Sequence, residues 1–206
     1  MEDTLNNTAE HHRDYTGAKM GMWLFLFTEM LLFGGMFILY AVYRFEYPAD
    51  FHTAAKELDT TLGAVNTLIL LTSSLTMALS IAALQKNRKR LSLVFQVVTM
   101  LLGAAFLGNK YVEWGAKIHH GIYPNSGHLL SLGKGQILFY GLYFIMTGLH
   151  GLHVLIGIGV FLFMFYFTKS GTVAEDNSVK LENAGLYWHL VDIIWVFLFP
   201  LFYLIT

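Results

Sequence analysis

The chain has 206 residues, of which 55% are hydrophobic, 16% aromatic and 13% charged, and its mean hydropathy is +0.53. This composition is more apolar than that of an average soluble domain and predicts a membrane protein. The net charge of −1 argues against a nucleic-acid partner, and the absence of cysteine excludes disulfides, thiolate metal sites and cysteine nucleophiles.

The first 18 residues are polar and lack both the basic start and the small-residue cleavage site of a secretory signal. We expect residues 1–18 to be a flexible cytoplasmic tail and residues 19–206 to form one transmembrane domain.

Five apolar runs follow, and a run of about 20 residues crosses a hydrocarbon core of about 30 Å. The predicted spans are Lys19–Tyr43, Thr61–Leu84, Leu91–Glu113, Gln136–Phe167 and Ala184–Ile205. The runs are continuous and do not alternate as barrel strands do, so they predict helices. The fold class is therefore an all-α membrane protein, a bundle of five transmembrane helices.

The connections between the spans predict the orientation. Residues 85–90, QKNRKR, allow only a tight turn, so the second and third spans form an antiparallel hairpin. Lys and Arg are more numerous on the side of this turn, with Arg13, Lys19, Lys86, Arg88, Lys89, Arg90, Lys169 and Lys180 against Arg44, Lys56, Lys117 and Lys134. The positive-inside rule then places the N-terminus in the cytoplasm and the C-terminus outside. The two longer outer loops, 44–60 and 114–135, are expected to be ordered caps.

Several ionisable residues fall at membrane depth, where each is costly and invites a functional interpretation. At 1.5 Å of rise per residue, one group reaches a common level in the cytoplasmic half of the bundle. Residues three or four apart share a helix face, which predicts a buried polar seam that also includes Trp195, because Trp188, Asp192 and Trp195 form one stripe along the last span. The group consists of Glu29, His150, His153, His189 and Asp192.

Four interpretations of this seam stay open. The polar groups could bind one another or lipid headgroups and so fix helix register, or they could carry or store protons. Two histidines and a carboxylate could also bind a transition metal, and His150 with His189 could supply one haem ligand pair. No spacing here demands coordination, so we predict no metal, cofactor or catalytic residue in this chain.

A second polar pair lies near the outer end of the third span. Lys110 and Glu113 are three residues apart on one helix face, so we predict an ion pair. Lys110 is expected to reach outward to the membrane boundary. Pro200, after Phe199, is expected to kink the last helix.

Three motifs resemble subunit III of the haem–copper oxidases. They are WLFLFTEMLLFGGMF from Trp23, GLHGLHVLIG from Gly148 and YWHLVDIIWVFLF from Tyr187. The likeness extends over the chain after residue 16. The resemblance implies a fold of seven helices from which the first two are missing, as in the shorter bacterial members.

The resemblance also implies a function without a catalytic centre in this chain. Haem and copper would belong to partner subunits I and II of a proton-pumping cytochrome c oxidase in a bacterial plasma membrane, part of aerobic respiratory electron transport. This chain would stabilise subunit I, bind phospholipid in a cleft, and support proton uptake and sustained turnover. Glu29 would be the family's buried carboxylate, and His150, His153, His189 and Asp192 would line the cleft.

Other functions stay open. Many oxidase members have an acidic residue where this chain has Lys110, and the Lys-x-x-Glu-aromatic form is similar to subunit-III-like proteins of nitric oxide reductases. Quinol oxidases have a five-helix subunit of the same size. Outside the family, the alternatives are a small proton-coupled transporter and a haem-bearing electron carrier.

Overall fold

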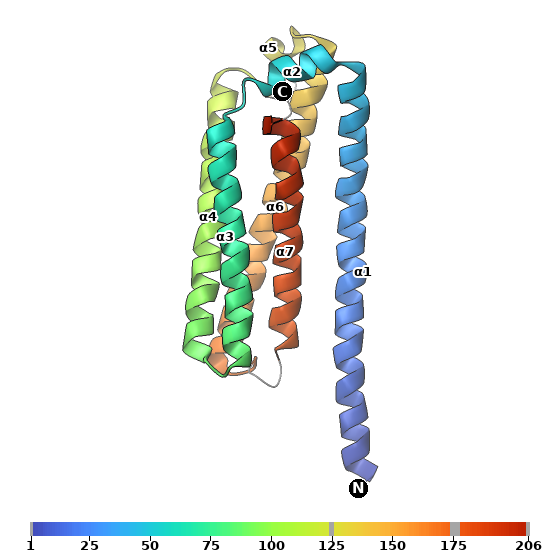
Figure 1. Ribbon diagram of the computed structural model, residues 1–206, viewed down its shortest axis with the longest axis vertical. Coiled ribbons are helices and arrows are strands. Elements are labelled where there is room, and N and C mark those ends of the chain that lie inside the picture. The colour runs from blue at the N-terminus through green and yellow to red at the C-terminus, as the bar shows by residue number, and fades with distance from the viewer. Residues whose placement is uncertain (1, 124–125, 174–177, 205–206) are drawn as a thin grey trace.

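The computed structural model describes residues 2–123, 126–173 and 178–204, with side chains from residue 16 onward. These ranges are helical and contain no strand. The elements are α1 (Glu2–Glu46), α2 (Pro48–Ala55), α3 (Thr60–Gln85), α4 (Lys89–His119), α5 (Gly127–Leu130), α6 (Lys134–Ser170), α7 (Val179–Phe199) and a π-helical turn, η2 (Pro200–Leu204). Figure 1 shows the five long helices side by side, with α2 and α5 at one end. We call this the α2 end, and the end that carries the α3–α4 turn the hairpin end.

Five helices are long and apolar enough to cross a membrane, which confirms the predicted all-α fold. These spans are Thr16–Glu46, Thr60–Gln85, Lys89–His119, Lys134–Ser170 and Val179–Leu204. The first helix differs from the expectation in its start, because α1 begins at Glu2 and so includes most of the segment predicted as a tail. The first proline is Pro48, and a helix that has formed extends readily where no proline stops it.

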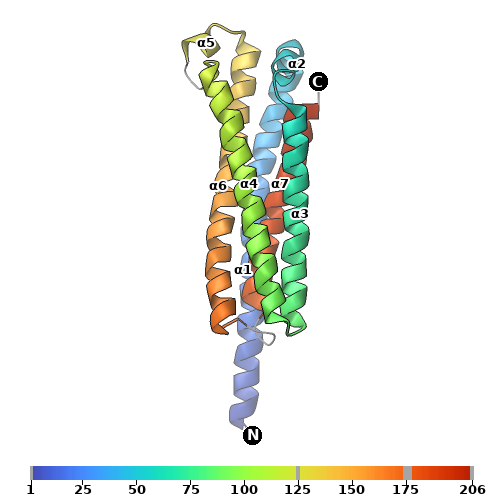
Figure 2. The same ribbon diagram turned by 90° about the vertical axis from the view of Figure 1, so that its left-hand side faces the viewer.

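Helices α3 and α4 form the predicted antiparallel hairpin and lie side by side (Figure 2). Asn87, with φ of 56°, turns the chain between them. The buried positions of α4 recur at the three- and four-residue spacing of a coiled-coil seam: Ser92, Gln96, Thr99, Gly103, Phe106, Lys110 and Glu113. Small and polar side chains at such a seam let membrane helices approach closely and bond to one another.

Polar pairs across the hairpin follow the same seam. The contacts are Ser80–Ser92 at 3.0 Å, Thr76–Thr99 at 2.8 Å and Asn109–Asn66 at 2.9 Å. Each pair satisfies hydrogen-bonding groups that hydrocarbon would leave unpaired. The two helices are therefore joined by polar contacts along their length.

At the α2 end, a short helix caps a long one. The Asp50 carboxylate of α2 accepts a hydrogen bond from the Gly135 amide, at 3.1 Å, in the first turn of α6. A Cβ at Gly135 would lie 2.6 Å from the Cβ of Tyr47, so this close approach requires glycine. Farther along, Tyr140 donates a hydrogen bond to Glu57, and Lys117 donates one to the Glu57 carbonyl. The loops predicted as ordered caps are tied to the bundle in this way.

The indole of Trp188 lies between α4 and α6 at positions where only glycine leaves room. A Cβ at Gly103 would lie 2.7 Å from this ring, and one at Gly157 would lie 2.8 Å from it. Farther along α7, the helix ends at Phe199, and Pro200 begins the π-helical turn. Pro200 therefore ends the regular helix at the position where we predict a kink.

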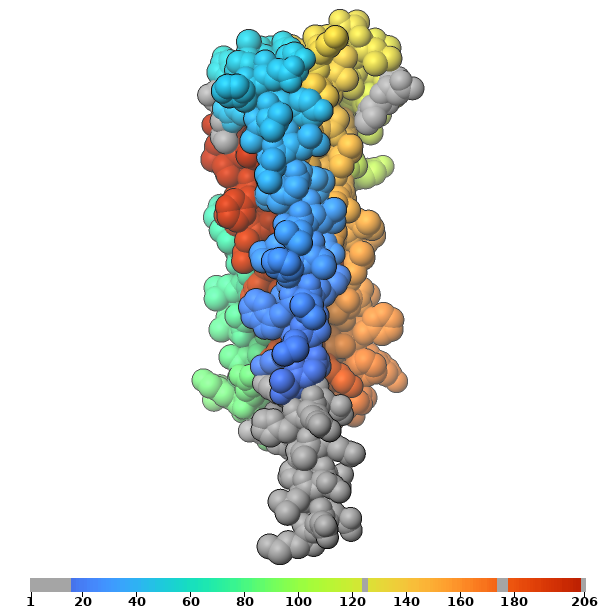
Figure 3. All heavy atoms as spheres, turned by 90° about the vertical axis from the view of Figure 1, so that its right-hand side faces the viewer, coloured from blue at the N-terminus to red at the C-terminus, as the bar shows by residue number. Residues whose placement is uncertain are grey.

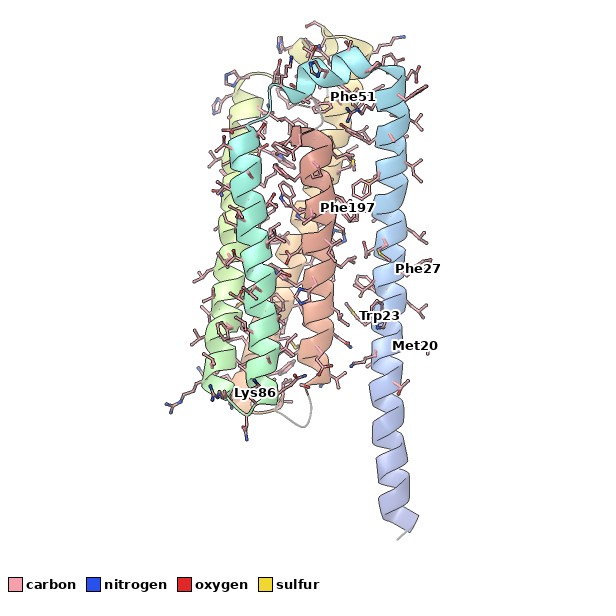
Figure 4. All side chains as sticks on the ribbon, in the orientation of Figure 1. Met20, Trp23, Phe27, Phe51, Lys86 and Phe197 are labelled. Atoms are coloured by element: carbon pink, nitrogen blue, oxygen red, sulfur yellow. The ribbon has the colours of Figure 1, made fainter. Side chains whose placement is uncertain are left out.

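Helix α1 packs against both α6 and α7, and in Figure 3 it lies in front of them, with α7 on one side and α6 on the other. At the α2 end, the Tyr40 hydroxyl donates a hydrogen bond to the Leu201 carbonyl at 2.5 Å. Phe197 of α7 lies between α7 and α1 in Figure 4, and the centroid of its ring is 6.1 Å from that of Phe37 of α1. At the hairpin end, Lys19 forms an ion pair of 3.0 Å with Glu182. Contacts at both ends thus fix α1 against the other helices.

Candidate functional site

Glu29 of α1 and His153 of α6 form a pair at membrane depth. The distance from Glu29 Oε2 to His153 Nε2 is 3.0 Å, and both side chains are largely buried. The other ring nitrogen, Nδ1, lies 2.7 Å from the Leu149 carbonyl. The ring of Phe33 packs against the imidazole in a T-shaped arrangement, with 5.4 Å between the ring centroids, and Tyr187 donates a hydrogen bond to the His153 carbonyl.

The partners of His153 fix how many protons the pair holds. A carbonyl only accepts, so Nδ1 must carry a proton and donate it to Leu149. The contact between Nε2 and the Glu29 carboxyl then needs one more proton, either on the imidazole or on the carboxyl. Glu29 and His153 therefore share one proton, which can sit on either side chain.

A cavity of about 400 Å³ lies next to this pair, between α1, α6 and α7. Its wall is largely apolar, with Lys180 and Asn183 toward the hairpin end: Met22, Phe25, Ile156, Val160, Lys180, Asn183, Ala184 and Tyr187. Met22 and Phe25 share a face of α1 with Glu29, because they precede it by seven and four residues. The Glu29–His153 pair thus lies next to an apolar cavity, on its side toward the α2 end.

Asp192 and His189 lie elsewhere on α7, on the side of α3. Asp192 is 3% exposed, and neither carboxyl oxygen has a hydrogen-bond partner among the described residues. His189 is half-buried, and its Nδ1 lies 2.6 Å from the hydroxyl of Ser74. The flanking indoles of Trp188 and Trp195 each donate to α3, to Ser73 Oγ and Thr67 Oγ1 at 3.0 Å.

His150 is fully buried among aromatic rings. The rings of Phe106 and Trp195 lie 5.4 and 5.2 Å from the imidazole. Neither ring nitrogen of His150 has a hydrogen-bond partner among the described residues. His150 therefore packs inside the bundle and does not take part in the Glu29–His153 pair.

Lys110 and Glu113 belong to a closed hydrogen-bonded network, the Lys110 network, with Tyr143 and Tyr203. Lys110 Nζ lies 3.0 Å from Glu113 Oε2 and donates to Tyr143 and Tyr203 at 3.2 and 2.9 Å. Both tyrosine hydroxyls donate to Glu113 Oε1 at 2.5 Å. The predicted pair is present, but the prediction that Lys110 reaches outward is wrong. Its ammonium turns inward because three oxygen partners lie there.

The structure separates the residues of the predicted single seam. Only Glu29 and His153 bond to each other. His189 bonds to Ser74, while Asp192 and His150 lie in two further places. Helix depth brings Glu29 and His153 to one level, but it does not give the direction in which each helix face points.

The sequence reasoning missed several partners of these residues. Tyr143 lies seven residues before His150, and Tyr203 lies eight after Trp195, so each continues a buried helix face. This spacing could have shown them. Ser74 carried no such signal, because serine is common in membrane helix interfaces.

No group of three or more His, Asp or Glu side chains suited to a metal ion occurs in the part of the chain that the structure describes. His150 is the most deeply buried imidazole, but aromatic rings and not further donors surround it.

Comparison with known proteins identifies a family. The family model described as cytochrome c oxidase subunit III matches residues 2–206. Cytochrome c oxidase subunit 3 of Alkalihalophilus pseudofirmus is 34% identical over 186 residues, covering 90% of this chain and 85% of the relative. The probable quinol oxidase subunit 3 of Staphylococcus saprophyticus is 32% identical over 207 residues, covering 100% and 97%. Cytochrome c oxidase subunit 3 of Thermostichus vulcanus is 31% identical over 204 residues, covering 96% and 91%.

Proposed function

The chain belongs to the cytochrome c oxidase subunit III family, and from this premise we propose that it is the non-catalytic subunit III of a proton-pumping haem–copper oxidase. It would lie in a bacterial plasma membrane beside subunits I and II, which would hold the haem and copper. The observation that carries the proposal is the family match over nearly the whole chain.

The proposed orientation has the N-terminus in the cytoplasm. The α3–α4 turn and the residues beside it carry Lys86, Arg88, Lys89 and Arg90, and such short cationic connections stay on the cytoplasmic side. The hairpin end would then face the cytoplasm, and the α2 end would face outward.

The cavity between α1, α6 and α7 supports a lipid-binding role. Its apolar wall suits a hydrocarbon chain, and Lys180 at the hairpin end suits an anionic headgroup. We propose that a phospholipid acyl chain fills this cavity and holds α1 against the bundle. In the assembled oxidase, this lipid would stabilise the contact with subunit I and sustain turnover.

A cavity-filling variant tests the lipid role. Val160→Trp should fill the cavity, and mass spectrometry of the complex released from native membranes should then show less bound phospholipid. Ile145→Trp is the matched control, because this α6 residue is 62% exposed and does not line the cavity. Equal lipid content in both variants and the wild type would refute the assignment of the cavity.

A pull-down of the tagged chain in mild detergent tests the function. We expect it to bring down a larger subunit with the absorption spectrum of a haem–copper oxidase. Recovery of the chain alone from native lipid discs would instead favour the transporter, and a partner with haem but no copper would favour a nitric oxide reductase.

A quinol oxidase is the second candidate, because relatives such as that of Staphylococcus saprophyticus carry this name. The co-purified complex decides between the two. Oxygen consumption with reduced cytochrome c indicates a cytochrome c oxidase, and oxygen consumption only with a quinol indicates a quinol oxidase.

A further inference from the structure

One imidazole nitrogen reaches the outer surface where α7 packs against α3 (Figure 1). His189 is half-buried, and its Nδ1 lies 2.6 Å from Ser74 Oγ. Its other nitrogen, Nε2, has no hydrogen-bond partner among the described residues. The bundle encloses both ring nitrogens of His150, but it does not enclose Nε2 of His189. This atom therefore faces outward, and it is not part of the cavity wall.

This nitrogen lies near the middle of its membrane span. His189 is ten residues after the start of Val179–Leu204 and fifteen before its end, which places it ~15 Å and ~23 Å from the two ends along the helix. In a hydrocarbon core of about 30 Å, the short imidazole cannot reach a lipid headgroup at either boundary. Acyl chains carry no hydrogen-bonding group, and an unpaired polar atom at this depth is costly. The position of Nε2 therefore favours contact with another protein over contact with lipid.

The surface around His189 suits the close approach of a transmembrane helix. Small residues of α3 recur beside it at a four-residue spacing, and such residues let membrane helices pack closely. The larger exposed side chains around them are apolar. We call this surface the His189 face, and it consists of Leu71, Ser74, Ala78 and Ala82 of α3 with His189 and Ile193 of α7.

The hydrogen bond to Ser74 determines what Nε2 can offer a partner. If the serine hydroxyl donates to Nδ1, Nε2 carries the ring proton and is a donor. If the hydroxyl accepts from Nδ1, Nε2 is a bare acceptor. A hydroxyl or a carboxamide group can bond to Nε2 in either case, because each contains both a donor and an acceptor.

We propose that the His189 face binds a transmembrane helix of the large oxidase subunit, which brings such a hydroxyl or carboxamide group to His189 Nε2. The inference rests on the proposed function, which supplies that subunit. A second copy of this chain fits less well, because a two-fold contact sets the same atom of each copy against itself. Two Nε2 atoms in the same protonation state would be two donors or two acceptors.

Photo-cross-linking in native membranes tests what occupies the face. A photoreactive phenylalanine analogue replaces Leu71, and in the control it replaces Leu101, an exposed leucine of α4. We expect the large subunit to be cross-linked from position 71 and not from position 101. Cross-links from position 71 only to lipid, or to a second copy of this chain, would overturn the proposal. So would a large subunit that is cross-linked only from position 101.

The absorption spectrum of the cross-linked complex separates this inference from the proposed function. A large subunit without haem or copper that is cross-linked from position 71 would overturn the proposed function. A haem–copper partner that co-purifies but is never cross-linked from position 71 would overturn only the assignment of the His189 face.

Substitutions test the fit of the helix and the hydrogen bond. Ala78→Trp should reduce the large subunit retained in mild detergent about tenfold, as a clash that costs ~1.4 kcal/mol would. Ala104→Trp, at an exposed alanine of α4, is the control and should leave retention unchanged. His189→Phe should reduce retention about threefold, as the loss of one membrane hydrogen bond of ~0.6 kcal/mol would, whereas His189→Gln should preserve it. Equal retention in the two tryptophan variants, or in the two His189 variants, with circular dichroism showing a folded chain, would overturn the proposal.

Discussion

Replacing Glu113 with glutamine should strongly destabilise the bundle, because it removes the only anion of the Lys110 network. Glu113 accepts hydrogen bonds from Tyr143 and Tyr203 and pairs with Lys110 at 3.0 Å. Glutamine has nearly the same shape and still accepts hydrogen bonds. The change therefore removes charge and leaves the packing in place.

The expected loss follows from the burial of Lys110, which is 7% exposed. Removing one member of a buried ion pair costs about 3–5 kcal/mol, because the other charge is left unpaired. Hydrogen bonds in membrane bundles are worth less than this, ~0.6 kcal/mol on average. The two tyrosine oxygens that stay with Lys110 also offset part of the loss. We therefore expect about 3 kcal/mol, the lower end of the range for a buried pair.

The assay is unfolding of the purified chain by an anionic detergent, followed by tryptophan fluorescence. Trp195 is a local reporter, since its ring lies 5.2 Å from Lys110 Nζ. The double variant Lys110→Met/Glu113→Gln removes both charges and should recover to within about 1 kcal/mol of the wild type. A loss of less than about 0.5 kcal/mol in Glu113→Gln, which is within the range of ordinary surface changes, would refute the reasoning. So would a double variant as unstable as the single one.

Two further substitutions test the packing and the cap. Gly157→Ala should lose about 1–3 kcal/mol of unfolding free energy, because the new Cβ would lie 2.8 Å from the Trp188 ring. Gly159→Ala is the control and should be neutral, because a Cβ there would meet nothing within 4 Å. Equal detergent stability of the two variants would contradict this prediction. Asp50→Ala should lower the unfolding free energy by about 1 kcal/mol, as the loss of a helix cap does, because Asp50 accepts a hydrogen bond from the Gly135 amide. Amide hydrogen exchange in the first turn of α6 should become faster. An unchanged exchange rate there would show that the cap is not needed.

The five spans were predictable because hydrocarbon imposes a length and an apolar composition on each helix. The hairpin of α3 and α4 was predictable for a similar reason, since six residues between two spans permit only a turn. The contacts at the α2 end were harder to predict from the sequence. Asp50 caps α6 only because the segment after α1 meets the segment before α6, and no local pattern in either segment predicts this contact.

The polar residues show where sequence reasoning stops. Depth along each helix placed Glu29 and His153 at one level, and they do meet. Depth alone predicts Asp192 at the same level, but Asp192 lies toward α3, because the packing of Trp188 and Trp195 against α3 sets the rotation of α7. The position of a residue along a helix follows from counting, whereas its partner follows from the packing of side chains on neighbouring helices.

The closed form of the Lys110 network limits how this part of the molecule can change in evolution. Each of its four side chains uses another as donor or acceptor, so a single replacement leaves a charge or a hydroxyl unmatched in the bilayer. A homologue with an acidic residue at position 110 would place two carboxyl groups side by side. We therefore expect positions 110, 113, 143 and 203 to vary jointly among relatives, so that the residue at position 110 indicates which residues occupy the other three.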